Sequence, residues 1–485
     1  MRGLRITPLA ALTPHPRPLS RKGRGEKENT MLTRREALAT AATLAAFPRL
    51  PAAAPPTLTA STFSIEVTCP IGHPCMGGGI APAREIVDPL YANGFVLQGA
   101  GKPVAVVAID WCEIRNGAYE AWRNAIAKAL GTDRVRVIVS ALHQHDTPIA
   151  DLEAEELLRK HKAVGSICDL EFHAKTVDRV ATAIKASLKE AKPVTHFGTG
   201  QATVEKVASN RRYTDAAGAV HYNRMSATRD PMIRAAEDGT IDPELKTLSL
   251  WNGDKPIVAV SAYATHPMSF YGRGGVTADF VGLARRRRQA ETPECLQIYV
   301  SGCSGNVTAG KYNDGSPDNR PVLADRIYKA MSAAWKGTIK KPIKDVSFRS
   351  ETIILEARSS KGFSAEELLA RLKNDPKPFG QCLAALGLSW KQRVEAGRGI
   401  DLPVLDFGDA AYALLPAEAY VEFQLLAQKQ RPTGFVLTAG YGECGPGYIP
   451  IERAWKENDS NLADWSWVNP GSEERMGTAI RKAIK

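Results

Sequence analysis

Short apolar runs alternate with segments of helical period along the chain from about residue 60 onward. Strands are expected at residues 102–110, 134–142, 194–207, 257–265, 296–300, 345–355, 402–415 and 434–438. Helices are expected at residues 118–130, 169–190, 285–292, 321–335, 364–372 and 378–396. No internal repeat or low-complexity tract interrupts the alternation. The pattern therefore predicts an α/β fold, a single large mixed-sheet domain rather than separable modules.

The charge balance does not indicate a nucleic-acid partner. The 485 residues are 44% hydrophobic and 24% charged, which is ordinary for a globular protein, but the net charge is +11 and the pI about 9.2. Residues 1–54 contain ten Lys/Arg and three Asp/Glu, a net of +7, so only +4 is left for the rest. No basic-aromatic motif accompanies that charge, and no nucleic-acid binding is expected.

The first 54 residues have the features of an export signal. Arg34-Arg35 precedes an apolar run at 37–47, which is too short to cross a bilayer, and small residues follow at 52–54. We expect a twin-arginine signal peptide at 31–54, cleaved between about residues 50 and 58, and a periplasmic or secreted protein; an amphipathic helix is the alternative. Residues 1–30 are expected to be disordered or not part of the native protein, which leaves one large domain at 55–485.

The cysteines and the hydropathy add two smaller expectations. The eight cysteines form no CxxC pair, and the chain is too large to need a disulfide scaffold. Export makes one or two disulfides possible, with Cys69–Cys75 the nearest pair, but the connectivity stays open. No transmembrane segment is expected after the signal. The run of four arginines at 285–288 is expected to be a solvated helix face.

Four of the expected strands run into residues that could bind a metal or do chemistry. His143 and His145 follow the strand at 134–142, and His266 follows the strand at 257–265. Thr308 lies in the loop after 296–300, and Glu418 follows 402–415. Ligands and catalytic groups collect at the carboxyl ends of strands in α/β proteins. Two histidines and a glutamate delivered there match a catalytic zinc site with an open position.

Each of these residues also has an ordinary structural explanation. His143 and His145 would face the same side if the strand continued through them, but an isolated His-x-His is often a hydrogen-bonded loop pair. A lone His266 would more often be structural, and a lone Glu418 could be a carboxylate at a helix start. Their shared position favours the metal site, because a buried imidazole or carboxylate must find a partner.

Several short motifs, in order, resemble the catalytic domain of the neutral ceramidases, zinc amidases that cleave ceramide to sphingosine and fatty acid. The motifs span about residues 60–480 and are Ser140-Ala-Leu-His143-Gln-His145-Asp-Thr-Pro, Asn210-Arg211, Ile241-Asp-Pro, Ala264-Thr-His266, Asp279, Gly305-Asn-Val-Thr308, Pro416-Ala-Glu418 and Gly447-Tyr448. The resemblance leaves no counterpart for the family's C-terminal immunoglobulin-like domain.

The resemblance implies roles for individual residues. It makes His143, His266 and Glu418 zinc ligands. The family's ligand tyrosine falls on Gly445 in an ungapped register, so the fourth ligand is expected to be Tyr448, with Tyr441 or water as alternatives. The same resemblance places His145 and Arg211 against the substrate or its developing oxyanion, Asp279 in a family loop of the site, and Thr308 at the family's serine position.

Together these expectations describe an exported zinc-dependent amidohydrolase. By the resemblance, it would hydrolyse an amide, such as N-acyl-sphingosine or another N-acyl lipid or small molecule, with zinc-activated water. Two alternatives stay open: a zinc hydrolase of esters or phosphoesters on the same fold, and a non-catalytic metal-binding relative. The sequence does not indicate an oligomeric state.

Overall fold

The computed structural model describes residues 58–485, which belong to one compact unit, Pro56–Lys485. The expected signal peptide at 31–54 and the segment at 1–30 lie outside the described residues. Within residues 58–485, no helix is both long and apolar enough to cross a membrane.

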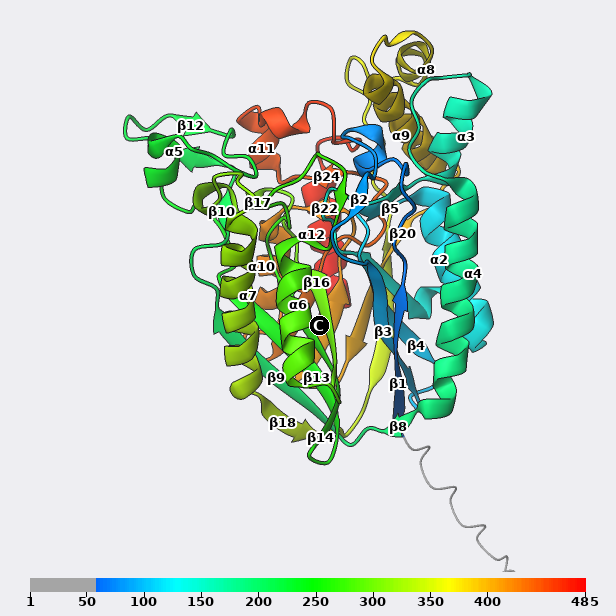
Figure 1. The fold of residues 1–485 in the computed structure, drawn as a ribbon, viewed down its shortest axis with the longest axis vertical. Coiled ribbons are helices and arrows are strands. Elements are labelled where there is room, and N and C mark those ends of the chain that lie inside the picture. Colours follow the sequence, from blue (N-terminus) through cyan, green and yellow to red (C-terminus); the bar gives the residue numbers. More distant parts are fainter. Residues whose placement is uncertain (1–57) are drawn as a thin grey trace, which may run out of the picture. The chain divides into compact units, whose positions relative to one another are not determined.

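Three mixed sheets form the body of the molecule (Figure 1). The first has the order β6 (Val137–Ala141), β4 (Val104–Ile109), β3 (Tyr91–Gln98), β1 (Thr59–Glu66), β8 (Lys192–Pro193). The second has the order β16 (Leu296–Ser301), β14 (Lys255–Tyr263), β13 (Glu244–Asn252), β9 (His196–Thr203), β18 (Ile339–Pro342). The third has the order β19 (Ser347–Ile353), β20 (Ile400–Asp406), β21 (Ala410–Leu414), β23 (Phe435–Ala439). Each contains one parallel pair, β4/β6, β14/β16 or β21/β23, so the predicted mixed-sheet α/β class is confirmed.

The three sheets share a central apolar core. Side chains such as Phe95, Val106, Val258, Leu405 and Leu437 belong to one buried cluster that takes residues from all three. Burial of apolar area there contributes roughly 25 cal/mol per Å². Because strands alternate their side chains between faces, the opposite faces are apolar too and must be covered.

Helices cover the outer faces of the sheets (Figure 1). α2 (Asn116–Leu130) and α4 (Leu170–Ser187) pack on the first sheet, and α6 (Asp279–Glu291) and α7 (Asn319–Lys336) pack on the second. α10 (Val421–Lys429) and α12 (Ser472–Ala483) pack on the third. α9 (Pro378–Glu395) packs against both α8 (Ala365–Asn374) and α3 (Leu152–Lys160), and α3 and α9 also contact α2.

Most of the predicted elements are present, and the structure refines several of them. The expected strand at 402–415 is a hairpin of β20 and β21, because the chain turns at Gly408, whose φ is +85°. The helix tail expected at 285–292 is the latter part of α6, which runs from Asp279 to Glu291. The arginine run is not wholly solvated: Arg285 is buried and donates two hydrogen bonds of 2.6 Å to Asp110. All eight cysteines lie in the described residues, buried and unpaired, so no Cys69–Cys75 disulfide forms here.

Short strand pairs hold the segments beyond the carboxyl ends of the long strands. They are β5 (Glu113–Ile114) with β7 (Ile149–Ala150), β10 (Ser209–Asn210) with β17 (Val307–Thr308), and β22 (Glu418–Ala419) with β24 (Tyr448–Ile449). Figure 1 labels β5, β10, β17, β22 and β24 toward one end of the sheets. Loops that would otherwise be free are thereby fixed around a common site.

Candidate metal centre and cavity

Three of the predicted ligands come together beyond the strand ends. His143 follows β6, His266 follows β14, and Glu418 opens β22 after β21. One possible ligand atom from each lies within 4.8 Å of the other two, and all three residues are buried. Residues more than 120 positions apart in sequence thus form one cluster that could hold a metal ion.

The His143 ring is fixed by its backbone and its neighbours. Its φ is +72°, and its backbone N–H donates to the Trp111 carbonyl. Nδ1 lies 3.0 Å from the Cys112 carbonyl oxygen, and the ring stacks on Tyr441 with centroids 4.2 Å apart. His143 and His145 lie beyond the end of β6, so the prediction that strand alternation aligns them is wrong. The turn brings both rings to one cavity instead.

The His266 ring is held in the same way. Nδ1 lies 2.6 Å from the Ser304 carbonyl oxygen and 3.2 Å from that of Val307. Nε2 lies 2.9 Å from Glu418 Oε2, and His143 Nε2 lies 3.1 Å from the same oxygen. Both histidines therefore turn Nε2 toward one carboxylate.

The hydrogen bonds fix the tautomers, and the tautomers define the site. A backbone carbonyl only accepts, so each Nδ1 must carry a proton, which leaves a lone pair on each Nε2 of a neutral ring. Two Nε2 lone pairs and the Glu418 carboxylate then face each other without a donor. His143 Nε2 and Glu418 Oε1 also have no hydrogen-bond partner, although they are buried. A cation at this point satisfies all three groups.

The charges of the cluster are strongly coupled. Burial and the nearby Arg211 lower the pKa of His266 to about 4, so its ring is neutral. Burial also lowers the pKa of His143, but the Glu418 carboxylate outweighs this and raises it above its ordinary value. Burial opposes ionisation of Glu418, yet the two histidines hold its pKa well below the usual range. Without a metal ion, a proton held between His143 and Glu418 therefore takes the place that a metal cation would occupy.

A cavity of about 310 Å³ opens beside the cluster. Its polar lining comes from the cluster and from the loop at 460–464. Its apolar wall consists of Met76, Met225, Phe379 and Trp465, and the rings of Phe379 and Trp465 stack 6.2 Å apart. The remaining lining residues are Cys112, His143, His145, Glu418, Tyr448, Ser460, Asn461, Ala463 and Asp464.

His145 and Arg211 lie close to this cavity as buried polar groups. His145 lines it, its Nδ1 has no hydrogen-bond partner, and Tyr271 packs edge-on at 4.8 Å. Burial and the neighbouring histidines hold the pKa of His145 well below its ordinary value. Arg211 is 2% exposed, and it donates to the Tyr448 hydroxyl at 2.7 Å and to Asn461 at 3.5 Å. Its cationic group is thus not neutralised by a hydrogen-bonded carboxylate.

The two candidate tyrosine ligands differ in placement. Tyr448 lines the cavity and lies opposite Glu418 in the β22/β24 pair. Tyr441 stacks on His143, but its hydroxyl is 2.7 Å from the Ser304 hydroxyl, and it does not line the cavity.

Thr308 and Asp279 are drawn into backbone contacts. The Thr308 hydroxyl donates to the Met225 carbonyl at 2.8 Å and accepts from the Gly310 N–H at 3.1 Å, and the residue is fully buried. Asp279, at the start of α6, accepts hydrogen bonds from the N–H and the hydroxyl of Ser269, which lies three residues after His266. Neither residue lines the cavity beside the metal cluster.

Some of the site could not be found from sequence motifs. Met76, Phe379 and Trp465 come from distant segments, and only their apolar character hinted at burial. Glu113 lies behind His143 with Oε1 3.8 Å from Nδ1. Glu113 comes three residues after the expected strand at 102–110, and this position could have marked it as a candidate. A carboxylate at the end of a buried strand needs a partner.

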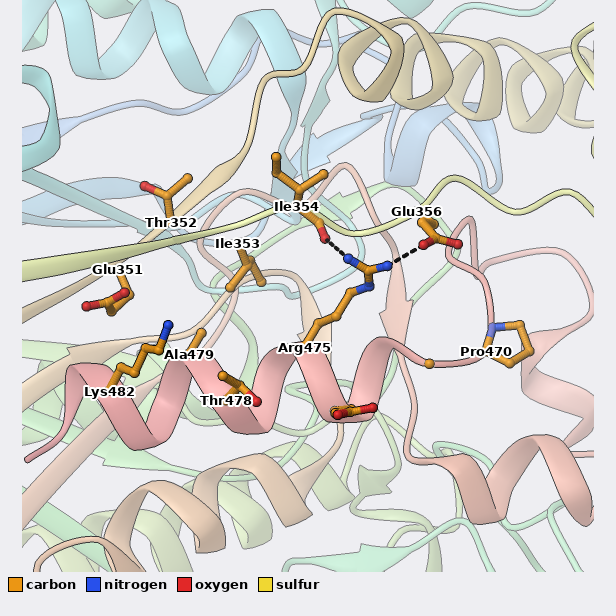
Figure 2. Close-up of a pocket in the computed structure, with 12 residues that line it drawn as sticks. Glu351, Thr352, Ile353, Ile354, Glu356, Pro470, Arg475, Thr478, Ala479 and Lys482 are labelled. Atoms are coloured by element: carbon orange, nitrogen blue, oxygen red, sulfur yellow. Dashed lines mark hydrogen bonds and ion pairs between the residues drawn. The ribbon is translucent and has the colours of Figure 1, made fainter.

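A second hollow lies elsewhere and lacks such chemistry. It has a volume of about 730 Å³ and runs between β19 and α12. Figure 2 shows Arg475 bonded to Glu356 and to the Ile354 carbonyl along it, with Lys482 further along α12. It contains no histidine or cysteine, and its charged groups are on the surface. The smaller cavity at the histidines is therefore the candidate site.

The comparisons with known proteins concern the fold of the chain. No known protein-family profile and no curated protein sequence matches the chain. Solved structures do match, among them two at 15% identity and over 88% of this chain. One is a ceramidase complexed with C2 (TM-score 0.63, 75% of that chain); the other is the neutral ceramidase of Pseudomonas aeruginosa (TM-score 0.62, 74% of that chain). The fold is that of the neutral ceramidases. The match covers 88% of this chain, so the predicted resemblance is confirmed for the architecture.

Proposed function

We propose that this protein is a zinc-dependent amidohydrolase that acts at the cavity beside His143, His266 and Glu418. One observation carries the proposal: two imidazole lone pairs and a carboxylate, all buried, face each other without a donor, and a cavity opens next to them. Such a cluster needs a proton or a metal cation to complete it, and its ligand atoms suit a metal.

The ligand set favours zinc among the metals. Two imidazole nitrogens and one carboxylate, with a further position open to the cavity, are typical of catalytic zinc sites. We propose Tyr448 as the fourth protein ligand, because it lines the cavity, whereas the Tyr441 hydroxyl is bound to Ser304. The backbone carbonyls behind both histidines would orient the rings and strengthen them as ligands.

When bound, zinc would supply an activated water and polarise the substrate carbonyl. The protein's own groups would do the rest. Arg211 keeps a fixed positive charge beside Tyr448 and would stabilise the negative charge that develops on the carbonyl oxygen. His145, a neutral imidazole with a free Nδ1, would hydrogen-bond the substrate. Thr308 would hold the Met225 wall, and Asp279 the loop after His266, as positioning residues.

The proposed substrate is an N-acyl amine. The ceramidase fold suggests an amide of a lipid, and the apolar wall of Met76, Met225, Phe379 and Trp465 suits an acyl or other apolar substituent. A cavity of about 310 Å³ lies at the lower end of what small-molecule sites offer, so it would enclose one substituent rather than a whole two-chain lipid.

Matched substrates test this proposal against the related hydrolases. An N-acyl amide, the corresponding ester and a phosphoester with the same apolar group would be assayed with zinc-loaded and chelator-treated protein. Amide turnover that disappears with the chelator and returns with zinc supports the proposal. Turnover of the ester or phosphoester alone would favour the other hydrolase class, and bound zinc without any turnover would indicate a binding protein.

A further inference from the structure

A buried carboxylate lies behind the proposed ligand His143, on the side of the ring away from Glu418. Glu113 is fully buried, and its Oε1 is 3.8 Å from His143 Nδ1. That oxygen has no hydrogen-bond partner. The Cys112 carbonyl, one residue earlier, receives the Nδ1 proton at 3.0 Å. The segment 112–113 therefore presents a carbonyl dipole and a carboxylate to the same edge of the ring.

Glu113 cannot easily move away from this position. Its other oxygen, Oε2, accepts a 2.7 Å hydrogen bond from Arg115. Arg115 is itself fully buried, donates to the Gly445 carbonyl at 2.8 Å, and lies 3.4 Å from Asp151. The β5/β7 pairing fixes the backbone of Glu113 against Ile149. A buried carboxylate with one oxygen held and one free is thus oriented toward His143.

The same network contains a second buried carboxylate without this relation. Glu443 accepts from the Asn116 N–H at 2.7 Å and from the Gly445 N–H at 2.9 Å, and it pairs with Arg393 at 3.1 Å. None of these contacts involves His143, His266 or Glu418. Glu443 resembles Glu113 in burial and in its arginine partner, but it does not approach the metal cluster.

We propose that Glu113 is a positioning residue of the metal site. This inference rests on the proposed function, since it assumes a cation between His143, His266 and Glu418. A bound cation favours the ionised form of Glu113, and that charge keeps the proton on Nδ1, so that Nε2 offers its lone pair to the cation. The same charge increases the basicity of the ring. Glu113 also contributes a negative charge that offsets a buried divalent ion. Arg115 holds the carboxylate without bonding the oxygen that faces the histidine.

Glu113→Gln and Glu443→Gln form a matched pair for the test. Zinc affinity would be measured by competition with a chromophoric chelator, together with the visible absorption of the cobalt-loaded protein and urea unfolding of the metal-free protein. We expect Glu113→Gln to weaken zinc binding about 10–100-fold and to alter the cobalt spectrum. Glu443→Gln should lose a similar amount of stability while its zinc affinity and cobalt spectrum stay close to those of the wild type.

Glu113→Asp guards against failure of the glutamine variant to fold. It keeps the charge that Arg115 needs but moves it away from the ring. Its zinc affinity should therefore lie between that of the wild type and that of Glu113→Gln. Equal zinc affinity in Glu113→Gln and the wild type, or in Glu113→Asp and the wild type, would overturn the inference. Equal weakening by Glu443→Gln would do so too, because the effect would then be general loosening. A wild-type protein that binds no metal would instead overturn the proposed function, and this inference with it.

Discussion

The backbone carbonyls of Cys112, Ser304 and Val307 decide the chemistry of the two histidines. They take the Nδ1 protons and so leave both Nε2 atoms as acceptors beside Glu418. The arrangement is unfavourable in isolation and is explained by a cation, which is why the metal site is the centre of the account.

Thr308 gives a prediction at the scale of a single hydroxyl. Because that hydroxyl bridges the Met225 carbonyl and the Gly310 N–H, we expect it to shape the cavity wall rather than to attack the substrate. Thr308→Val keeps the shape and removes the hydroxyl. It should cost about 1–3 kcal/mol of stability, because two buried partners are left unpaired. Amide turnover should fall by less than about 100-fold, which is smaller than the loss expected when a proton-transfer group is removed.

Thr308→Ser, which restores the hydroxyl, serves as the control and should recover both stability and turnover. Mass spectrometry with an activated acyl substrate supplies the decisive observation. A covalent acyl adduct on Thr308, or complete loss of turnover in a folded Thr308→Val protein, would show that the residue is a nucleophile.

At the scale of elements, the strand ends could be predicted and the contacts between loops could not. The apolar runs that form β6, β14 and β21 fix where the chain leaves each sheet, so the placement of His143, His266 and Glu418 followed from local sequence. The hydroxyl of Thr308 depends on Met225, which is 83 residues away, and Glu113 depends on the β5/β7 pair. No local pattern encodes such partners, because tertiary packing chooses them.

The helix α4 gives a prediction for the pH dependence of stability. His173, on its buried face, packs beside Trp111 and Trp122 with Nε2 unpartnered, and burial lowers its pKa from 6.5 to about 4. Between these pH values the unfolded chain binds a proton that the folded chain does not. The free energy of unfolding should therefore decrease as the pH falls from about 6.5 to 4.

His173→Phe removes this titration and keeps an aromatic ring between the tryptophans. Urea unfolding gives the free energy of unfolding at pH 7 and at pH 5. The decrease between these two pH values should be about 1–2 kcal/mol smaller in the variant than in the wild type. Identical losses in the two proteins would mean that His173 is not buried as a neutral ring.

At the scale of the whole molecule, three sheets with one core direct loops from distant segments to a single cavity. The volume of that cavity predicts a preference for compact acyl groups. Along a series of N-acyl amides from acetyl to palmitoyl, kcat/KM should peak at short or medium chains, since about 310 Å³ cannot enclose a long one. Phe379→Ala should move the optimum to longer chains, whereas Phe348→Ala, in β19, should not. An unchanged optimum in Phe379→Ala would mean that the acyl group binds elsewhere.

Export is the second prediction at this scale, and it concerns residues outside the described part of the chain. If residues 31–54 are a twin-arginine signal, Arg34→Lys with Arg35→Lys should leave the protein in the cytoplasm. Cell fractionation and immunoblotting measure the distribution. The same periplasmic yield from the double variant and the wild type would contradict this route.

The metal content of the purified protein tests the central claim most directly. Elemental analysis should find one zinc ion per chain in the wild type and in His161→Ala, a control at the end of α3. It should find almost none in His266→Ala or Glu418→Ala, because each removes one of three buried ligands. Full zinc occupancy in either of these variants, or a wild type that contains no metal and binds none, would contradict the account.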